Sequence, residues 1–188
     1  MIRPARSLDI AAAIRAVLSR SHELGVDPDK VVLMGHSAGA HLVALVGTDQ
    51  RYLKDVGLSF TNLKGVITLD GAAYDVPRQM QEGPQIMKAT YQAVFGGNKT
   101  RQQAVSPTYQ AGAPNVARFF ILHVQRTDGI AQSNALAAAL KRGGTDVEIL
   151  SVPGTGLQGH GEINRRMGDP SYVPTAAVDQ WLHKVFTR

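Results

Sequence analysis

Apolar residues along the chain follow two patterns, and together these patterns predict most of the secondary structure. Helical spacing of three or four residues predicts three helices, over about 8–18 with Ser7 as a possible cap, over 131–142, and around 178–185. Short continuous apolar runs predict four buried strands, at 31–34, 65–69, 118–124 and 147–152. A further helix is expected from Ala38 to about Val46. This alternation predicts an α/β fold with a mostly parallel sheet and helices on both of its faces.

The segment from Ala72 to Pro114 departs from this alternation. Proline and the Gly96-Gly97 pair interrupt several short helical stretches, while apolar residues such as Ile86 and Phe95 continue through it. A segment of this length with its own apolar residues indicates a cap-like insertion rather than a linker. We therefore expect one domain over residues 1–188, with the insertion at about 72–114.

Composition and charge exclude several classes of function. The net charge is +5, but Lys and Arg are scattered, so a nucleic-acid partner is not expected. No apolar run approaches the ~20 residues that span a bilayer, and the N-terminus does not resemble a signal peptide. These features favour a cytoplasmic protein with no membrane association. The chain has no cysteine, which rules out disulfides, thiolate catalysis and cysteine-bound metals.

One motif carries a specific chemistry. The run Gly35-His36-Ser37-Ala38-Gly39 follows the first predicted strand and precedes a predicted helix of small residues. This is the setting of a nucleophile elbow, in which a serine occupies an abrupt strand-to-helix turn. Gly35 and Gly39 lack side chains that could collide in such a turn. Ser37 is therefore the candidate nucleophile, and the backbone N–H of Ala38 is a candidate oxyanion donor.

A serine nucleophile needs a histidine to accept its proton. His160 is the expected base, because it lies in a glycine-rich segment, 153–161, that we predict to be a loop after the last strand. Of the other histidines, His36 and His41 flank the serine and are expected to shape the site. The remaining ones are expected to have structural roles, and these are His22, His123 and His183.

The carboxylate that orients this histidine has two candidates. Asp128 follows the third predicted strand, and Asp70 ends the second. Reactive groups of a parallel sheet gather beyond the carboxyl ends of its strands, so both positions fit. We favour Asp128, because the third strand is expected to lie beside the last one, with Asp70 as the alternative that would otherwise brace nearby loops.

Three segments resemble the α/β-hydrolase superfamily, in particular the short-chain carboxylesterases of its hormone-sensitive-lipase-like and arylformamidase-like group. They are GVDPDKVVLMGHSAGAHL at 25–42, LDGAAYDV at 69–76 and INR at 163–165. The resemblance extends over nearly the whole chain. It implies an α/β-hydrolase fold with Ser37 as nucleophile, Asp128 as acid and His160 as base.

The chain also departs from that group. Its members carry an upstream half with four further strands and an HGGG-type loop that helps to bind the oxyanion, and no HGG sequence occurs here. We therefore expect a truncated α/β-hydrolase fold, in which the elbow strand lies at an exposed sheet edge. Such an edge invites pairing with another chain, so a homo-oligomer is expected.

These observations predict a serine carboxylesterase that cleaves small acyl esters. The same triad could instead hydrolyse an aryl formamide or act as a lyase or acyltransferase, and the shortened chain could serve as a catalytically weak scaffold. The histidines lack His-Glu-x-x-His spacing, and the elbow has neither the third glycine of a dinucleotide loop nor the lysine of a phosphate loop. No cofactor and no metal are therefore expected.

Overall fold

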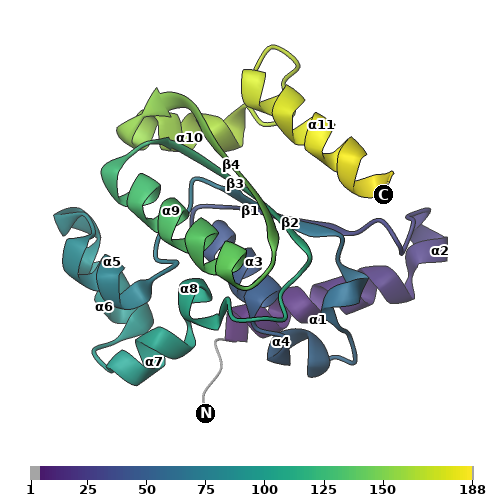
Figure 1. The fold of residues 1–188 in the computed structure, drawn as a ribbon, viewed down its shortest axis with the longest axis horizontal. Coiled ribbons are helices and arrows are strands. Elements are labelled where there is room, and N and C mark those ends of the chain that lie inside the picture. The colour runs from purple at the N-terminus through teal and green to yellow at the C-terminus, as the bar shows by residue number, and fades with distance from the viewer. Residues whose placement is uncertain (1–4, 188) are drawn as a thin grey trace.

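Four parallel strands form one sheet, and their order in space is their order in the sequence, in a computed structural model that describes residues 5–187 (Figure 1). The strands are β1 Val32–His36, β2 Gly65–Leu69, β3 Arg118–Gln125 and β4 Asp146–Thr155. Each pairs in parallel with the next. This confirms the predicted sheet, and it brings the carboxyl ends of all four strands to one edge.

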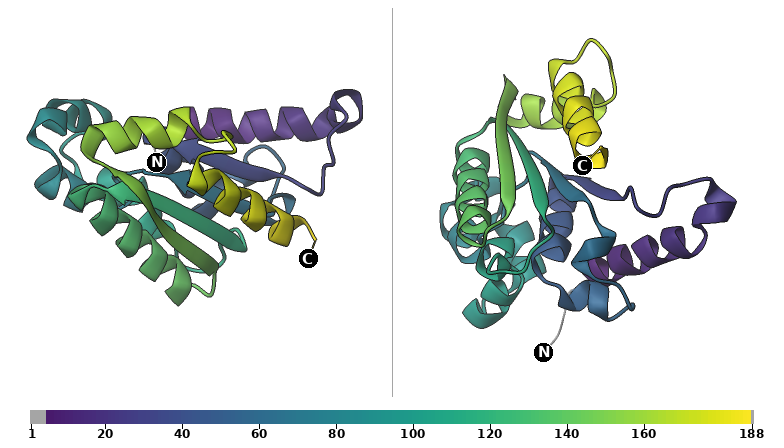
Figure 2. Two further views of the ribbon diagram at one scale, coloured as in Figure 1. Left: turned by 90° about the horizontal axis from the view of Figure 1, so that it is seen from above. Right: turned by 45° about the vertical axis from the view of Figure 1, so that its right-hand side comes forward.

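Helices cover both faces of the sheet (Figure 2). On one face lie α1 Ala5–Ser19, α3 Ala38–Thr48 and α9 Thr127–Arg142, and on the other lie α10 Gly156–Arg165 and α11 Val173–Phe186. The shorter helices are α2 Ser21–Leu24, α4 Arg51–Lys54, α5 Val76–Glu82, α6 Lys88–Phe95, α7 Lys99–Ala104 and α8 Pro107–Gln110, with 3-10 turns at Phe60–Asn62 and Gln85–Met87.

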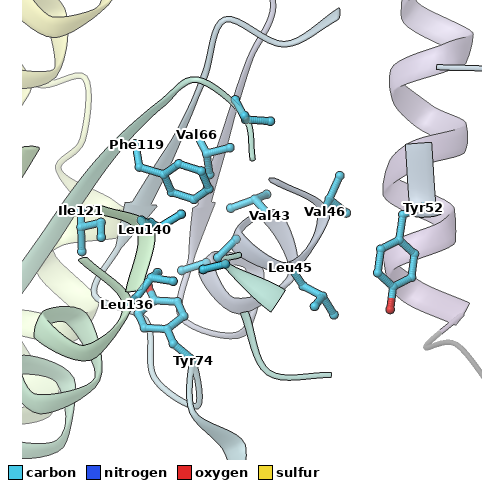
Figure 3. Packing of buried hydrophobic residues seen from close by; sticks show 14 of the residues in the cluster. Val43, Leu45, Val46, Tyr52, Val66, Tyr74, Phe119, Ile121, Leu136 and Leu140 are labelled. Carbon is cyan, nitrogen blue, oxygen red and sulfur yellow. The ribbon is translucent and has the colours of Figure 1, made fainter. Parts of the chain in front are cut away.

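The strands read as continuous apolar runs because both of their faces are buried. Val66 and Phe119 pack into the cluster that includes α3 and α9 (Figure 3). Their neighbours Ile67 and Phe120 point to the opposite face and pack with Trp181 of α11. Side chains alternate between the faces of a strand, so one apolar run supplies both cores.

The structure corrects four details of the predicted elements. Helix α1 begins at Ala5, so Ser7 lies buried within it and is not its cap. Helix α9 begins at Thr127 rather than at 131. The glycine-rich segment that was predicted as a loop forms the end of β4 and the start of α10. The short helices α2 and α4 were not predicted, since they lack the length that makes a periodic pattern visible.

The predicted insertion consists of α5 to α8 and packs beside α3. Contact is made through Phe95 of α6, whose ring centroid lies 5.6 Å from that of His41 in α3. His41 is buried, and its Nδ1–H donates to the carbonyl of Ala73 at 2.9 Å. Burial disfavours the charged imidazole and outweighs this hydrogen bond, and it lowers the pKa of His41 to about 4.

This buried histidine makes the stability of the protein depend on pH. Between an ordinary histidine pKa of about 6.5 and a folded-state pKa of about 4, the unfolded chain binds a proton that the folded chain does not. The free energy of unfolding should therefore decrease as pH falls through this window, by roughly 2–3 kcal/mol between pH 7 and 4.5. Asparagine keeps a donor near the position of Nδ1 and does not titrate, so His41→Asn should remove most of this loss.

Urea unfolding of the wild type and of His41→Asn at both pH values measures the difference. His22→Asn, at an exposed position of α2, is the matched control and should retain the wild-type loss. An equal loss in wild type and His41→Asn would contradict the assignment.

Candidate active site

Ser37 occupies the turn between β1 and α3. Its backbone adopts φ 56° and ψ −119°, a conformation that is uncommon for a residue with a side chain. The turn is held from both sides, because the N–H of Ser37 donates to the carbonyl of Leu69 at 3.1 Å and its own carbonyl accepts from the N–H of His41. A strained backbone conformation of this kind persists where the surrounding structure holds it in place, and it is typical of functional positions. The predicted strand–turn–helix setting of Ser37 is confirmed.

The two glycines of the elbow differ in what they allow. A Cβ on Gly35 would lie 2.4 Å from the carbonyl oxygen of Gly39, so the turn can close only with glycine at position 35. A Cβ on Gly39 would meet no atom within 4 Å. The expectation of steric need is therefore correct for Gly35 and wrong for Gly39.

His160 reaches the carboxyl ends of the strands because α10 begins at the residue directly after the last residue of β4. Gly154 near the end of β4 has φ 118°, and a Cβ on Gly159 would lie only 2.5 Å from its carbonyl carbon. Glycine at these two positions lets the backbone of the helix rest directly on the end of the strand. The prediction of a loop around His160 was thus wrong, but the glycines act as expected in returning the histidine over the sheet.

The imidazole of His160 bridges a hydroxyl and a carboxylate. Its Nε2 lies 3.0 Å from the Oγ of Ser37, and its Nδ1 lies 2.6 Å from Oδ2 of Asp70. A carboxylate oxygen only accepts, so Nδ1 carries the proton and Nε2 is free to accept the hydroxyl proton of Ser37. The three groups come from the ends of β1 and β2 and from α10, far apart in the sequence.

Asp70 is held as an ion inside the protein. Its side chain is fully buried, and besides the His160 contact it accepts from the N–H of Val124 at 3.0 Å and from Nε of Arg126 at 3.0 Å. Burial alone would raise the pKa of Asp70, but the hydrogen bond from His160, the charge of Arg126 and the Val124 N–H together lower it below its ordinary value. A carboxylate with these donors stays charged across the neutral pH range.

The structure brings Asp70, the alternative candidate, to His160. Asp128 does not contact His160, because it lies in the first turn of α9 and faces the insertion. Its Oδ2 accepts from Nε2 of Gln79 at 3.1 Å and from Nη1 of Arg126 at 3.3 Å. The reasoning that the third strand lies beside the last was correct, but side-chain direction decides which carboxylate reaches the histidine.

Two further residues belong to the site, and one of them, Arg126, was missed in the sequence. Arg126 bonds both carboxylates, and its position directly after β3 was a signal that could have revealed it. His36 donates from Nε2 to the backbone carbonyl of His160 at 2.8 Å, with the two ring centroids 4.5 Å apart. Burial is the main cause that lowers the pKa of His36. His36 thus lies against the backbone that presents His160, in line with the expectation that it shapes the site.

The histidines expected to be structural lie away from the Ser37 hydroxyl. His123 is buried in β3, whereas His22 and His183 are exposed on α2 and α11. Within residues 5–187, no three His, Asp or Glu side chains are grouped as a metal site requires. In the same part of the chain, no helix has both the length and the apolar character needed to cross a bilayer.

Comparisons with known proteins identify the fold. A sequence profile described as the alpha/beta hydrolase fold matches residues 3–161. Curated protein sequences gave no match.

Solved structures that resemble the chain include esterases and a bifunctional hydrolase. An acetyl ester-xyloside bifunctional hydrolase from Caldicellulosiruptor lactoaceticus has a TM-score of 0.72 at 24% identity, covering 98% of this chain and 67% of that one. A thermophilic esterase from Thermogutta terrifontis has a TM-score of 0.68 at 26% identity, covering 95% and 63%. Esterase B from Lactobacillus rhamnosis has a TM-score of 0.76 at 19% identity, covering 96% and 62%.

The chain spans roughly two thirds of the length of these structures. The match of the family profile covers most of the sequence, from the first helix to the histidine of the site. The chain belongs to the α/β-hydrolase fold family.

Proposed function

We propose that the protein is a serine carboxylesterase that cleaves small acyl esters through an acyl-enzyme on Ser37. The observation that carries this proposal is the pair of hydrogen bonds at His160, to the Ser37 hydroxyl at 3.0 Å and to the Asp70 carboxylate at 2.6 Å. The Thermogutta esterase, at 26% identity, supports an ester as the substrate. We assign Asp70, rather than Asp128, as the acid of the triad.

In the proposed mechanism, Ser37, His160 and Asp70 act together in each step of ester cleavage. Oγ of Ser37 attacks the ester carbonyl while Nε2 of His160 takes its proton, and the buried carboxylate of Asp70 stabilises the imidazolium that forms. The imidazolium then protonates the departing alcohol, which leaves an acyl group on Ser37. A water molecule deprotonated by the same histidine attacks this acyl-enzyme and releases the carboxylic acid.

The start of α3 supports charge stabilisation at the reacting carbonyl. The first N–H groups of a helix have no partner within the helix, and the positive end of the helix dipole lies there. We assign the N–H of Ala38, the first residue of α3 after Ser37, as one oxyanion donor. Removing one such donor typically costs ~10²–10³ in rate, so a single donor still contributes substantially to catalysis.

Covalent labelling tests the nucleophile. A fluorophosphonate reacts rapidly only with a serine that a neighbouring base activates, so the wild type should gain one label on Ser37, located by peptide mass spectrometry. Ser37→Ala should lose both the label and the hydrolysis of short-chain nitrophenyl esters. Ser19→Ala, which removes an exposed hydroxyl on α1, should behave as wild type. An unlabelled wild type with an intact fold would indicate a scaffold rather than an enzyme.

Two isosteric variants test the choice of acid. Asp70→Asn removes the charge that stabilises the imidazolium and the acceptor that fixes its tautomer, so kcat should fall by about 10³–10⁴-fold. Asp128→Asn should lower kcat by less than about tenfold, since this residue reaches His160 only through Arg126. Circular dichroism during thermal unfolding establishes that both variants fold. The reverse ranking of the two rates would return the role of acid to Asp128.

We further propose that the protein forms a homodimer through the open edge of β1. Within residues 5–187 this strand pairs with β2 alone, so the backbone groups on its other side can pair with a second copy. Met34 on β1 is exposed, and so are apolar side chains earlier in the chain, at Val17 in α1, Leu24 in α2 and Val26 after it. Antiparallel pairing of two β1 strands about a two-fold axis would satisfy the edge of this strand in both copies and bring Met34 of each copy into the interface.

A charge at the centre of this edge should separate the copies. Met34→Lys places an ammonium on β1, and light scattering should then show a monomer where the wild type shows a dimer. Val173→Lys introduces the same charge at an exposed apolar position of α11 and should leave the dimer intact. A monomeric wild type would contradict the proposal.

A further inference from the structure

One guanidinium joins the two carboxylates of the site. Arg126 donates from Nε to Oδ2 of Asp70 at 3.0 Å and from Nη1 to Oδ2 of Asp128 at 3.3 Å. Its Nη2 also lies 3.4 Å from the backbone carbonyl of Asp70. The planar guanidinium therefore links Asp70, which contacts His160, to Asp128, which does not.

These charges interact in surroundings with little water. The side chains of Arg126, Asp70 and Asp128 are 15%, 0% and 10% exposed. The backbone of α9 closes the space beside them, because a Cβ on Gly129 would lie 3.1 Å from Nη2 of Arg126 and 3.2 Å from Oδ1 of Asp70. Charges screened this weakly act on one another over several ångströms.

The second carboxylate is itself fixed from the other side. Gln79 of α5 is buried, and its Nε2 donates to Oδ2 of Asp128 at 3.1 Å and to the hydroxyl oxygen of Tyr91 at 3.1 Å. Asp128 is thus held between the guanidinium and the insertion. A bond network of this kind keeps Arg126 in one orientation against Asp70.

The charge of the cluster changes when His160 works as a base. With a neutral imidazole, the two carboxylates and one guanidinium sum to −1. With an imidazolium the sum is zero. The positive charge of Arg126 repels the imidazolium and so disfavours it. The negative charge of Asp128 attracts the imidazolium and so favours it. Arg126 therefore makes proton transfer to His160 less favourable, and Asp128 makes it more favourable.

We propose that Arg126 and Asp128 are positioning residues that hold Asp70 against His160 and together set the pH range in which His160 accepts the proton of Ser37. This inference rests on the proposed esterase function. It goes beyond that function because it gives a role to Arg126 and Asp128, which do not touch the reacting atoms.

Other ionisable groups also face His160 and stay the same in every comparison below. His36 lies across from it on β1, with its ring centroid 4.5 Å away, and Asp70 contacts it directly. Three more ionisable groups belong to α10 and the segment after it, namely Glu162, Arg166 and Tyr172, and Tyr172 interacts electrostatically with Asp70 and with the other two. Because these groups are common to all variants, a shift in a pH profile reports on the substituted charge.

The test is the pH dependence of kcat/KM for a short-chain nitrophenyl ester. Loss of the cation in Arg126→Met makes protonation of the imidazole easier, so the pH at which the rate falls to half should rise by about one unit. Loss of the anion in Asp128→Asn makes it harder, so the half-rate pH should fall by about half a unit. The two variants should shift the profile in opposite directions.

Two more variants separate a charge effect from loss of shape. Arg126→Lys keeps the cation and loses the planar fork, so it should lower kcat while retaining the wild-type half-rate pH. If Arg126→Met does not fold, the downward shift of the half-rate pH in Asp128→Asn carries the test. Glu82→Gln removes an exposed carboxylate from α5, where it pairs with Arg78, and should match the wild type in both rate and profile.

The outcomes are distinguishable from failure of the esterase proposal. If Ser37 of the wild type takes no fluorophosphonate label, the function itself is wrong. If Ser37 is labelled but both variants shift the profile in the same direction, or lower the rate with no shift, Arg126 and Asp128 serve only the fold, and the inference is overturned.

Discussion

A charged carboxylate buried at the end of β2 is the interaction on which the site depends. An ion in the interior is costly unless donors surround it, and Asp70 has donors from three separate elements. The N–H of Val124 comes from β3, the guanidinium of Arg126 from the start of α9, and the imidazole of His160 from α10. The hydrogen bonds that offset the cost of burying the Asp70 carboxylate include the one from His160. This bond holds His160 in the tautomer that can accept a proton.

Close backbone packing makes this convergence possible. Gly35 permits the serine turn, because any side chain there would meet the carbonyl of Gly39 at 2.4 Å. Gly154 and Gly159 permit α10 to lie on the end of β4. In both places glycine shortens the path between a strand and the helix that follows it. The reactive groups therefore sit at the strand ends on regular elements rather than on long loops, which favours a well-defined geometry.

The segment between β2 and β3 also contributes to the surroundings of Asp70. Helices α5 and α6 reach the site through Gln79 and its bond to Asp128, so the insertion supports the charge cluster as well as flanking the serine helix. Ser37 follows β1, which within residues 5–187 pairs with β2 alone. Ser37 is partly exposed, whereas the side chain of Asp70 is fully buried.

Much of this protein is determined by local sequence. The apolar runs predicted all four strands, and β2 was predicted with its observed limits, because a strand buried on both faces must be apolar along its length. The elbow was predicted from five residues, since a strand-to-helix turn at a serine leaves few alternatives. His160 was singled out by its glycine-rich surroundings, although these form a helix rather than a loop.

Only the tertiary structure shows which of the two carboxylates contacts His160. Asp70 and Asp128 both follow strands, and the sequence places them at the same edge of the sheet. The direction of each side chain depends on the twist of the sheet, on the φ of 43° at Asp70 and on the early start of α9 at Thr127. None of these is encoded in the residues next to the carboxylates. Local pattern therefore determined which residue types reach the sheet edge, and long-range packing decided which of them touch.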